Sequence, residues 1–322
     1  MKTHKLLDKD ASTKFYEARY ADGYMDDWDA AKKERVKEVI IKMNLPTQGQ
    51  ALDYGCGNGV FTEVLAQALP GWKIYGSDIS LVALANAARR FPKVLFFEGG
   101  KANELTFNFI FTHHVLEHVP DISASAQEMA ALAAPNAHML HIMPCGNAGS
   151  FEHKICALRK DGTDPTLGNR FFFEDEGHVR RLTSAQLVAV FAPFGFRYTQ
   201  GLFANQYEGA LAWISDYSDE FITDLTNPAQ AVDTQASLEL MRIRQLLFDY
   251  KHTKVQALAY RANGIPYTHG LRSLGIMIKQ FLKAYRFNHQ YEADKRRFAT
   301  EWATRATQEN GSEMYIMLNP GQ

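Results

Sequence analysis

The chain has 322 residues, of which 46% are hydrophobic and 22% are charged, and its formal net charge is −1. This composition is that of a folded soluble protein, long enough for one large domain or for a core with a smaller domain beside it. We expect neither a membrane-spanning helix nor a secretory signal, because the sequence has no apolar run of about 20 residues and its first residues carry no apolar stretch.

The three cysteines, Cys56, Cys145 and Cys156, are sparse and lack CxxC spacing. Such a set argues against a disulfide framework and is typical of the reducing cytoplasm, where we expect the protein to act. The near-neutral net charge hides a basic region, because residues 251–310 contain 11 Lys or Arg and only four acids. A solvated helix face is the favoured explanation of such a region.

The first predicted element is a helix over residues 16–43, whose apolar side chains recur at helical spacing. After it, strands are predicted at residues 51–54, 72–76, 94–97, 107–111 and 138–143. Helices are predicted at residues 60–69, 80–90 and 121–133, the second with Ser80 as its N-cap. Strands that alternate with helices imply a doubly wound α/β fold, in which a parallel sheet is covered on both faces and ligands bind beyond the carboxyl ends of the strands.

A long connection follows at residues 144–182, and a loop of this length is more often functional than idle. It leads to a helix at 183–194 and a strand at 196–203. Residues 209–310 are predicted to be mostly helical, with breaks at Pro228 and at 264–270, and residues 313–318 form a last strand beside 196–203. We therefore divide the chain into an N-terminal helical lid (1–48), a core (49–208 with 311–322) and a helical insertion (209–310).

A glycine-rich turn lies between the first strand of the core and its helix. It runs Asp53-Tyr-Gly55-Cys-Gly57-Asn-Gly59, with a glycine at every second position. Glycines let the backbone turn sharply and approach a ligand, and the start of the following helix points N–H groups at it. Asp78 ends the next strand, where a carboxylate can accept hydrogen bonds from both hydroxyls of a ribose.

The GxGxG turn, preceded by an acid, resembles motif I of the class I S-adenosylmethionine-dependent methyltransferases, and Asp78 matches their ribose-binding acid. The resemblance implies a seven-stranded, mostly parallel sheet with an antiparallel last strand, and S-adenosyl-L-methionine as cofactor. Relatives often have an acid near the adenine where this chain has Gly99 and Gly100, so this segment departs from the family pattern for adenine recognition. The implied cofactor-binding residues are Asp53, Gly55, Cys56, Gly57, Gly59, Asp78, Ile79, Gly99, Gly100, Thr112 and His113.

The fourth strand ends in Thr112-His113-His114-Val-Leu-Glu117-His118-Val, which resembles the VLEHV-like string of the same family. Three readings stay open. Glu117 and His118 can anchor the next helix, which is the favoured reading. His114 or His118 can act as a general base. His114, Glu117 and His118 form HxxEH, similar to the ExxEH metal-binding string of ubiquinone and small-RNA O-methyltransferases, although a hard cation prefers oxygen ligands.

Two further segments supply candidates. His141 lies within the fifth strand, where a core histidine is the better reading, and Cys145 is read as structural. In the long connection, a mixture of aromatic, acidic and basic residues makes Glu174, His178 and Arg180 candidates for substrate contact, with His178 also a candidate catalytic group. The alternative is a loop held by ion pairs.

The N-terminal aromatic residues Tyr16, Tyr20, Tyr24 and Trp28 are read either as a lid that excludes water from the site or as core packing, and Tyr24 is a candidate for substrate contact. In the insertion, residues 271–285 combine an apolar face with Arg272, Lys279 and Lys283. Such a helix can rest on anionic lipid or bind RNA, but a partner helix or the face of a homo-oligomer is the commoner explanation.

The sequence thus favours an enzyme that transfers the methyl group of S-adenosylmethionine to oxygen, less readily to nitrogen. The acceptor is a small molecule or a glycan- or lipid-linked biosynthetic intermediate, which fold and cofactor site do not specify. Two alternatives remain. One is an RNA methyltransferase that uses the basic insertion, which is not favoured; the other is a non-catalytic module that keeps the cofactor fold and regulates a partner.

Overall fold

The computed structural model describes residues 8–101, 105–264 and 273–321, without the side chains of 273 and 274. The strands are β1 (Gly49–Tyr54), β2 (Trp72–Asp78), β3 (Leu95–Glu98), β4 (Phe107–His113), β5 (Ala133–Pro144), β6 (Thr163–Asp164), β7 (Arg170–Phe171), β8 (Phe196–Ala204) and β9 (Glu313–Pro320). The α-helices are α1 (Lys9–Ala21), α2 (Ala30–Lys42), α3 (Val60–Ala68), α4 (Leu81–Arg90), α5 (Ile122–Leu132), α6 (Phe151–Ala157), α7 (Ser184–Phe191), α8 (Glu208–Asp216), α9 (Asp219–Leu225), α10 (Thr234–Asn263) and α11 (Ser273–Arg305).

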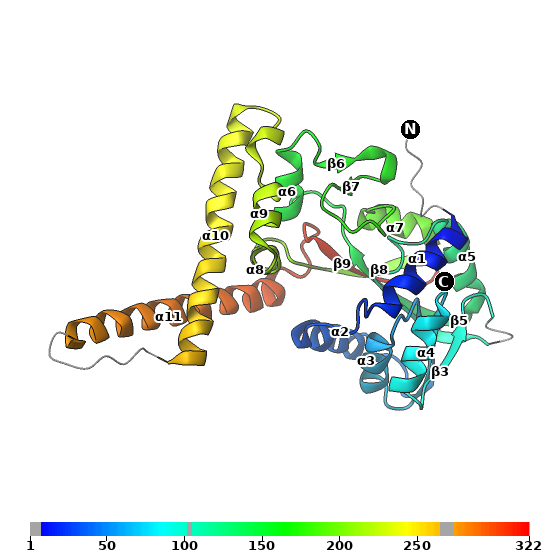
Figure 1. Ribbon diagram of the computed structural model, residues 1–322. Coiled ribbons are helices and arrows are strands. Elements are labelled where there is room, and N and C mark those ends of the chain that lie inside the picture. The colour runs from blue at the N-terminus through cyan, green and yellow to red at the C-terminus, as the bar shows by residue number, and fades with distance from the viewer. Residues whose placement is uncertain (1–7, 102–104, 265–272, 322) are drawn as a thin grey trace.

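The centre of the molecule is a seven-stranded sheet in the order β3-β2-β1-β4-β5-β9-β8 (Figure 1). Neighbouring strands from β3 to β5 are parallel, whereas β9 lies antiparallel between β5 and β8. This arrangement confirms the predicted fold class, including the return of the last strand to the sheet beside β8. The carboxyl ends of the parallel strands meet at one edge, and the antiparallel β9 brings its first residue, Glu313, to that same edge.

Alternation along the central strands fills a hydrophobic core on each face of the sheet. In β4, Phe109 and Phe111 pack with α2 and α3, while Ile110 packs on the other face with α5 and α7. Successive side chains of a strand point to opposite faces, so a strand buried on both sides reads as a continuous apolar run. Several helices begin at capping side chains, and Ser80 at the start of α4 accepts a hydrogen bond from the N–H of Ala83 as predicted.

The single helix predicted over residues 16–43 is wrong, because the chain forms α1 and α2 with a break between them. The break contains Gly23 at φ +83° and Met25 at φ +55°, two left-handed positions that end the helical path. Helical spacing continues across the break, which is why the sequence pattern did not reveal it. The break turns the chain so that α2 covers α3 while α1 crosses toward α4 and the ligand edge of the sheet.

The long connection at 144–182 is not structureless. Ser150 caps α6, and residues 163–171 form a small hairpin of β6 and β7. The apolar side of α6 packs through Phe151 and Ile155 against α8, α9 and α10 in a third hydrophobic cluster. This cluster joins the connection to the helices that follow β8.

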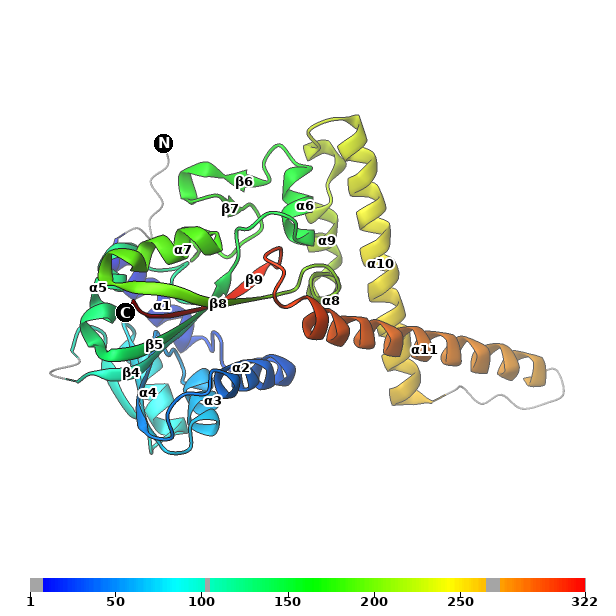
Figure 2. The ribbon, with the colours of Figure 1, turned by 180° about the vertical axis from the view of Figure 1, so that it is seen from behind.

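The helices between β8 and β9 extend away from the sheet, with α11 projecting farthest (Figures 1 and 2). The predicted break at 264–270 begins at Gly264, which ends α10, and the rest of it lies outside the described residues, as do the first residues of the amphipathic segment 271–285. The division of the chain into lid, core and insertion stays a prediction. No helix in the described ranges is both long and apolar enough to cross a membrane.

Ion pairs neutralise part of the basic region. Lys251 and Lys254 of α10 bind Asp219 and Asp216, which lie outside residues 251–310. Arg261 and Lys295 both bind Glu292 within it. The net positive charge of this region is therefore smaller in the folded protein than the sequence alone suggests, because residues outside the region supply acids.

Candidate functional site

The glycine-rich turn takes the left-handed backbone that its sequence requires. Gly55, Gly57 and Gly59 have φ of +77°, +51° and +81°. A Cβ atom on Gly57 would lie 2.7 Å from the hydroxyl oxygen of Tyr20, and one on Gly55 would lie 2.5 Å from the side chain of Val115. Only glycine fits at these two positions, because other residues would combine backbone strain with a collision.

Two buried carboxylates hold the turn in place. Asp78 accepts hydrogen bonds from the backbone N–H groups of Gly57 at 2.8 Å and Ser80 at 2.9 Å. Burial raises the pKa of Asp78, while these N–H groups act to lower it. Burial also raises the pKa of Asp53 to about 7, against the hydrogen bond that Thr62 donates to it at 2.6 Å.

Two adjoining cavities open at this edge of the sheet. The larger has a volume of about 260 Å³ and the smaller about 70 Å³. Both are lined by Tyr16, Tyr20, Gly55, His114 and His118. Of the other residues predicted at the site, the larger cavity is lined by Asp78, Ile79 and Gly99, and the smaller by Tyr24, Asp53, Cys56, Gly57 and His113.

The helix α1 and the residues after it cover the glycine turn. Tyr16, Tyr20, Tyr24 and Trp28 all line a cavity, which is the placement expected of a lid. Arg19 fastens this cover: its guanidinium makes a two-pronged ion pair with Asp175 of the long connection, at 2.6 and 2.8 Å, and lies over the ring of Tyr24. The cover is thus tied to the far side of the site.

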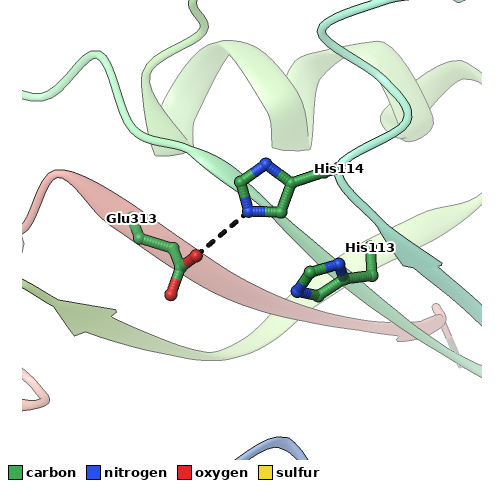
Figure 3. A group of neighbouring side chains, drawn as sticks. All are labelled: His113, His114 and Glu313. Carbon is green, nitrogen blue, oxygen red and sulfur yellow. Dashed lines mark hydrogen bonds and ion pairs between the residues drawn. The ribbon is translucent and has the colours of Figure 1, made fainter. Parts of the chain in front are cut away.

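His114 is fixed at the end of β4 by its backbone and by two acids. It has φ +53°, its N–H donates to the carbonyl of Ile142 at 2.8 Å, and its Nε2 lies 3.1 Å from Glu313 (Figure 3). Its Nδ1 lies 3.0 Å from Glu117 in an ion-pair contact. Burial works to lower the pKa of His114, but the two acids outweigh it and raise that pKa. Both ring nitrogens of His114 already face acids, so the ring is poorly placed to act as a general base.

His118, in the loop after β4, and His178, in the long connection, both lie close to the buried Glu117. Nδ1 of His118 lies 2.7 Å from the hydroxyl of Tyr16, and Nδ1 of His178 lies 2.6 Å from Glu174. Burial lowers the pKa of His118 to about 4 against the attraction of Glu117, so its ring is neutral near pH 7. Ligand atoms of Glu117, His118 and His178 come within 4.8 Å of one another, although the sequence separates His178 from the others by about sixty residues.

Several predicted site residues lie away from the two cavities. Thr112 bonds through its hydroxyl to Nδ1 of His141 inside the sheet, at 2.9 Å. Gly59 begins α3, and the N–H of Gly100 donates to Glu128. His113, in contrast, lies at the wall of the smaller cavity, where its ring stacks on Phe61 and burial lowers its pKa.

The long connection is held by ion pairs, as one of the two sequence readings proposed. Glu174 accepts hydrogen bonds from Arg181 and from the N–H of Phe171. The guanidinium of Arg180 donates to the carbonyls of Leu116, Val119 and Pro120. In the structure both side chains support the loop after β4 and line neither cavity.

Sequence reasoning missed residues that reach the site from distant parts of the chain. Glu313 binds His114 and also the ammonium group of Lys32 in α2. Glu128 of α5 lines the larger cavity and accepts hydrogen bonds from Tyr54 and from the N–H of Gly100. No local pattern marks either acid, because each is brought to the site only by the packing of its element.

Comparisons with known proteins agree with the fold. A family model described as a methyltransferase domain matches residues 28–200. The trans-aconitate 2-methyltransferase of Methylobacterium nodulans is 31% identical over 157 residues, which cover 45% of this chain and 60% of that protein. The enzyme of the same name from Variovorax paradoxus is 30% identical over 132 residues, covering 37% and 51%. The chain therefore spans between half and two thirds of the length of these relatives.

Among solved structures, the phosphoethanolamine N-methyltransferase 2 of Haemonchus contortus, in complex with S-adenosyl-L-methionine, aligns over 89% of this chain and 53% of that chain. It has a TM-score of 0.43 and 14% sequence identity.

Proposed function

The chain belongs to the methyltransferase domain family of the class I S-adenosylmethionine-dependent enzymes, and we propose that it methylates an oxygen atom of a small molecule. One observation carries the proposal. The wall of the larger cavity includes Asp78, Ile79 and Gly99, which suit a nucleoside, and also Tyr16, His114 and His118, which suit a polar acceptor. One space thus serves both reactants, as direct transfer requires.

The residues present fit S-adenosylmethionine. Gly57 has no side chain where a Cβ would fill the bend of the turn, and Asp78 is a buried carboxylate at the end of β2. Asp78 receives two backbone hydrogen bonds, which fix its orientation while lone pairs remain for ribose hydroxyls. When bound, the cofactor supplies a sulfonium methyl group that an oxygen lone pair displaces in one step, leaving the carbon–sulfur electron pair on sulfur.

The acceptor end favours an oxygen that already carries negative charge. Lys9 lies at the wall of the larger cavity and can pair with an anionic acceptor, whereas the charge of His114, at the same cavity, is already matched by Glu117 and Glu313. A carboxylate needs no general base to attack a methyl group, whereas a hydroxyl must lose its proton. The two named relatives are methyltransferases of trans-aconitate, which is an acid. We therefore propose a small carboxylic acid as the acceptor class.

The test is a transfer assay with methyl-labelled S-adenosylmethionine and a panel of small di- and tricarboxylic acids, amines, sugars and RNA. We expect label in base-labile methyl esters of one or a few of the acids. Label confined to amines or RNA would contradict the acceptor class and leave the cofactor assignment standing. Absence of any cofactor binding would contradict both.

A further inference from the structure

We propose that Glu117, His118 and His178 form a binding site for one divalent first-row transition-metal ion at the acceptor end of the larger cavity. The existence of the site follows from the side chains alone, and only its role in holding the acceptor rests on the proposed function. The sequence had offered His114 rather than His178 as the third ligand, so the structure changes the ligand set.

The first observation is the state of Glu117. Its side chain is fully buried, and neither carboxylate oxygen accepts a hydrogen bond from the described residues. His114 meets one oxygen at 3.0 Å as an ion pair without the alignment of a hydrogen bond. A buried carboxylate with coordination left over is what a metal ion satisfies.

The second observation is the orientation of the two imidazoles. His178 bonds to the carboxylate of Glu174 through Nδ1, which places the proton on Nδ1 and leaves the Nε2 lone pair free. His118 bonds through Nδ1 to the hydroxyl of Tyr16, whose oxygen can accept the Nδ1 proton and free Nε2 in the same way. Histidines that bind metals through one nitrogen nearly always donate the other to such a partner.

The third observation is convergence. Nε2 of His118 lies 4.0 Å from Oε1 of Glu117, and the three ligand groups come within 4.8 Å of one another. In a tetrahedral site, ligand atoms about 2.0–2.2 Å from a shared ion stand roughly 3.3–3.6 Å apart. The three groups therefore need to approach one another by up to roughly 1.5 Å when the ion binds.

The donor set selects the class of ion. Two imidazoles and one carboxylate suit zinc, iron, cobalt or nickel, whereas magnesium prefers oxygen ligands. His114 is not a ligand, because its two nitrogens already face Glu117 and Glu313. The neighbouring group of His113, His114 and Glu313 (Figure 3) is a poorer site, because Lys32 and His114 already balance the charge of Glu313.

Three protein ligands leave positions open. Of the three, His118 lines both cavities, whereas Glu117 and His178 lie behind it and line neither. An ion there can bind oxygens of the acceptor and orient one of them, which is Lewis-acid positioning. A histidine that holds a metal through Nε2 cannot take a proton at that atom. The site therefore replaces the reading of His118 and His178 as general bases.

The test uses the full chain, stripped with a chelator and dialysed against Zn²⁺ or Co²⁺. We expect about one ion bound per chain and, with Co²⁺, a visible absorption band of an imidazole-bound ion. His178→Asn keeps a donor for Glu174 near the position of Nδ1 but removes Nε2, and Glu117→Gln removes the charge. Each should weaken metal binding at least tenfold, whereas His289→Ala, an exposed histidine of α11, should not change it.

Circular dichroism melting checks that each variant folds, and the two substitutions are independent, so one folded variant suffices. Equal metal binding by wild type and a folded variant would overturn the site, as would no binding of either ion to the wild type. S-adenosylmethionine affinity, measured calorimetrically on the stripped protein, reports separately on the proposed function. Loss of the metal site with cofactor binding intact is thereby distinguished from failure of the cofactor assignment.

Discussion

At the scale of single residues, the site depends on positions where few other residue types would fit. Gly57 combines a left-handed backbone with a Cβ position 2.7 Å from the Tyr20 hydroxyl. Gly195, at φ +86°, also has a left-handed backbone, but a Cβ atom built on it would have no heavy atom within 4 Å beyond its chain neighbours. Comparing substitutions at Gly57 and Gly195 therefore separates the energetic cost of the backbone conformation from the cost of displacing Tyr20.

Gly57→Ala is expected to destabilise the fold by about 1–2 kcal/mol through its backbone and also to weaken S-adenosylmethionine binding, because it displaces Tyr20. Gly195→Ala should show a similar loss of stability with unchanged cofactor affinity. Chemical denaturation and calorimetry measure the two quantities. Equal cofactor affinity in both variants would mean that the turn does not hold the ligand.

His141 is the buried histidine of β5. Its Nδ1 meets the hydroxyl of Thr112, its ring stacks on Phe191, and burial lowers its pKa to about 3. The unfolded chain binds a proton at this residue below about pH 6.5, whereas the folded chain does not. The free energy of unfolding is therefore unaffected by His141 above that pH. It falls as the pH drops toward 3, by about 1.4 kcal/mol for each pH unit.

We expect His141 alone to lower the free energy of unfolding of the wild type by about 2.5 kcal/mol when the pH falls from 7.5 to 4.5. His141→Asn, which keeps a partner for Thr112 and does not titrate, should lack this part of the pH dependence. Urea unfolding of both proteins across the range gives the difference, in which carboxylates common to both cancel. Parallel stability curves would contradict the burial of a neutral His141.

At the scale of elements, α1 acts on the site from outside the sheet. Tyr16 meets His118, Tyr20 covers Gly57, and Arg19 ties the helix to Asp175. Nothing in the helical pattern of residues 9–21 indicates these contacts, since they join α1 to segments more than 30 and more than 90 residues away. The same limit applies to Glu313, which lies beside His114 because β9 runs antiparallel to its neighbours.

Arg19→Ala should loosen this cover. The side chains of Arg19 and Asp175 are 25% and 33% exposed, so solvent screens their ion pair. We expect its removal to destabilise the closed position of α1 by about 0.5–1 kcal/mol. This corresponds to roughly two- to fivefold faster release of S-adenosylmethionine. Stopped-flow displacement measures the rate, with Lys42→Ala, whose partner Glu38 lies on the same exposed helix, as the control. An unchanged release rate in Arg19→Ala would argue against a lid.

At the scale of the whole molecule, the sequence predicted the parts of the fold that follow from local patterns. The parallel strands, the Ser80 cap, the glycine turn with Asp78, and the return of the last strand are all present. The break between α1 and α2, the helix α6 and the ion pairs that offset the basic region were not predicted. Each of these depends on contacts between distant segments, which a pattern read along the chain does not contain.

The central claim is that the crevice between the glycine turn and Asp78 binds S-adenosylmethionine. Calorimetric titration of the cofactor into wild type, Asp78→Asn and the surface control Asp249→Asn tests it most directly. We predict one site per chain in wild type and control. Asp78→Asn should bind about ten- to a hundredfold more weakly, since hydrogen bonds to a charged group contribute about 1.5–3 kcal/mol. Equal affinity in all three proteins, or no binding to wild type, would contradict the account.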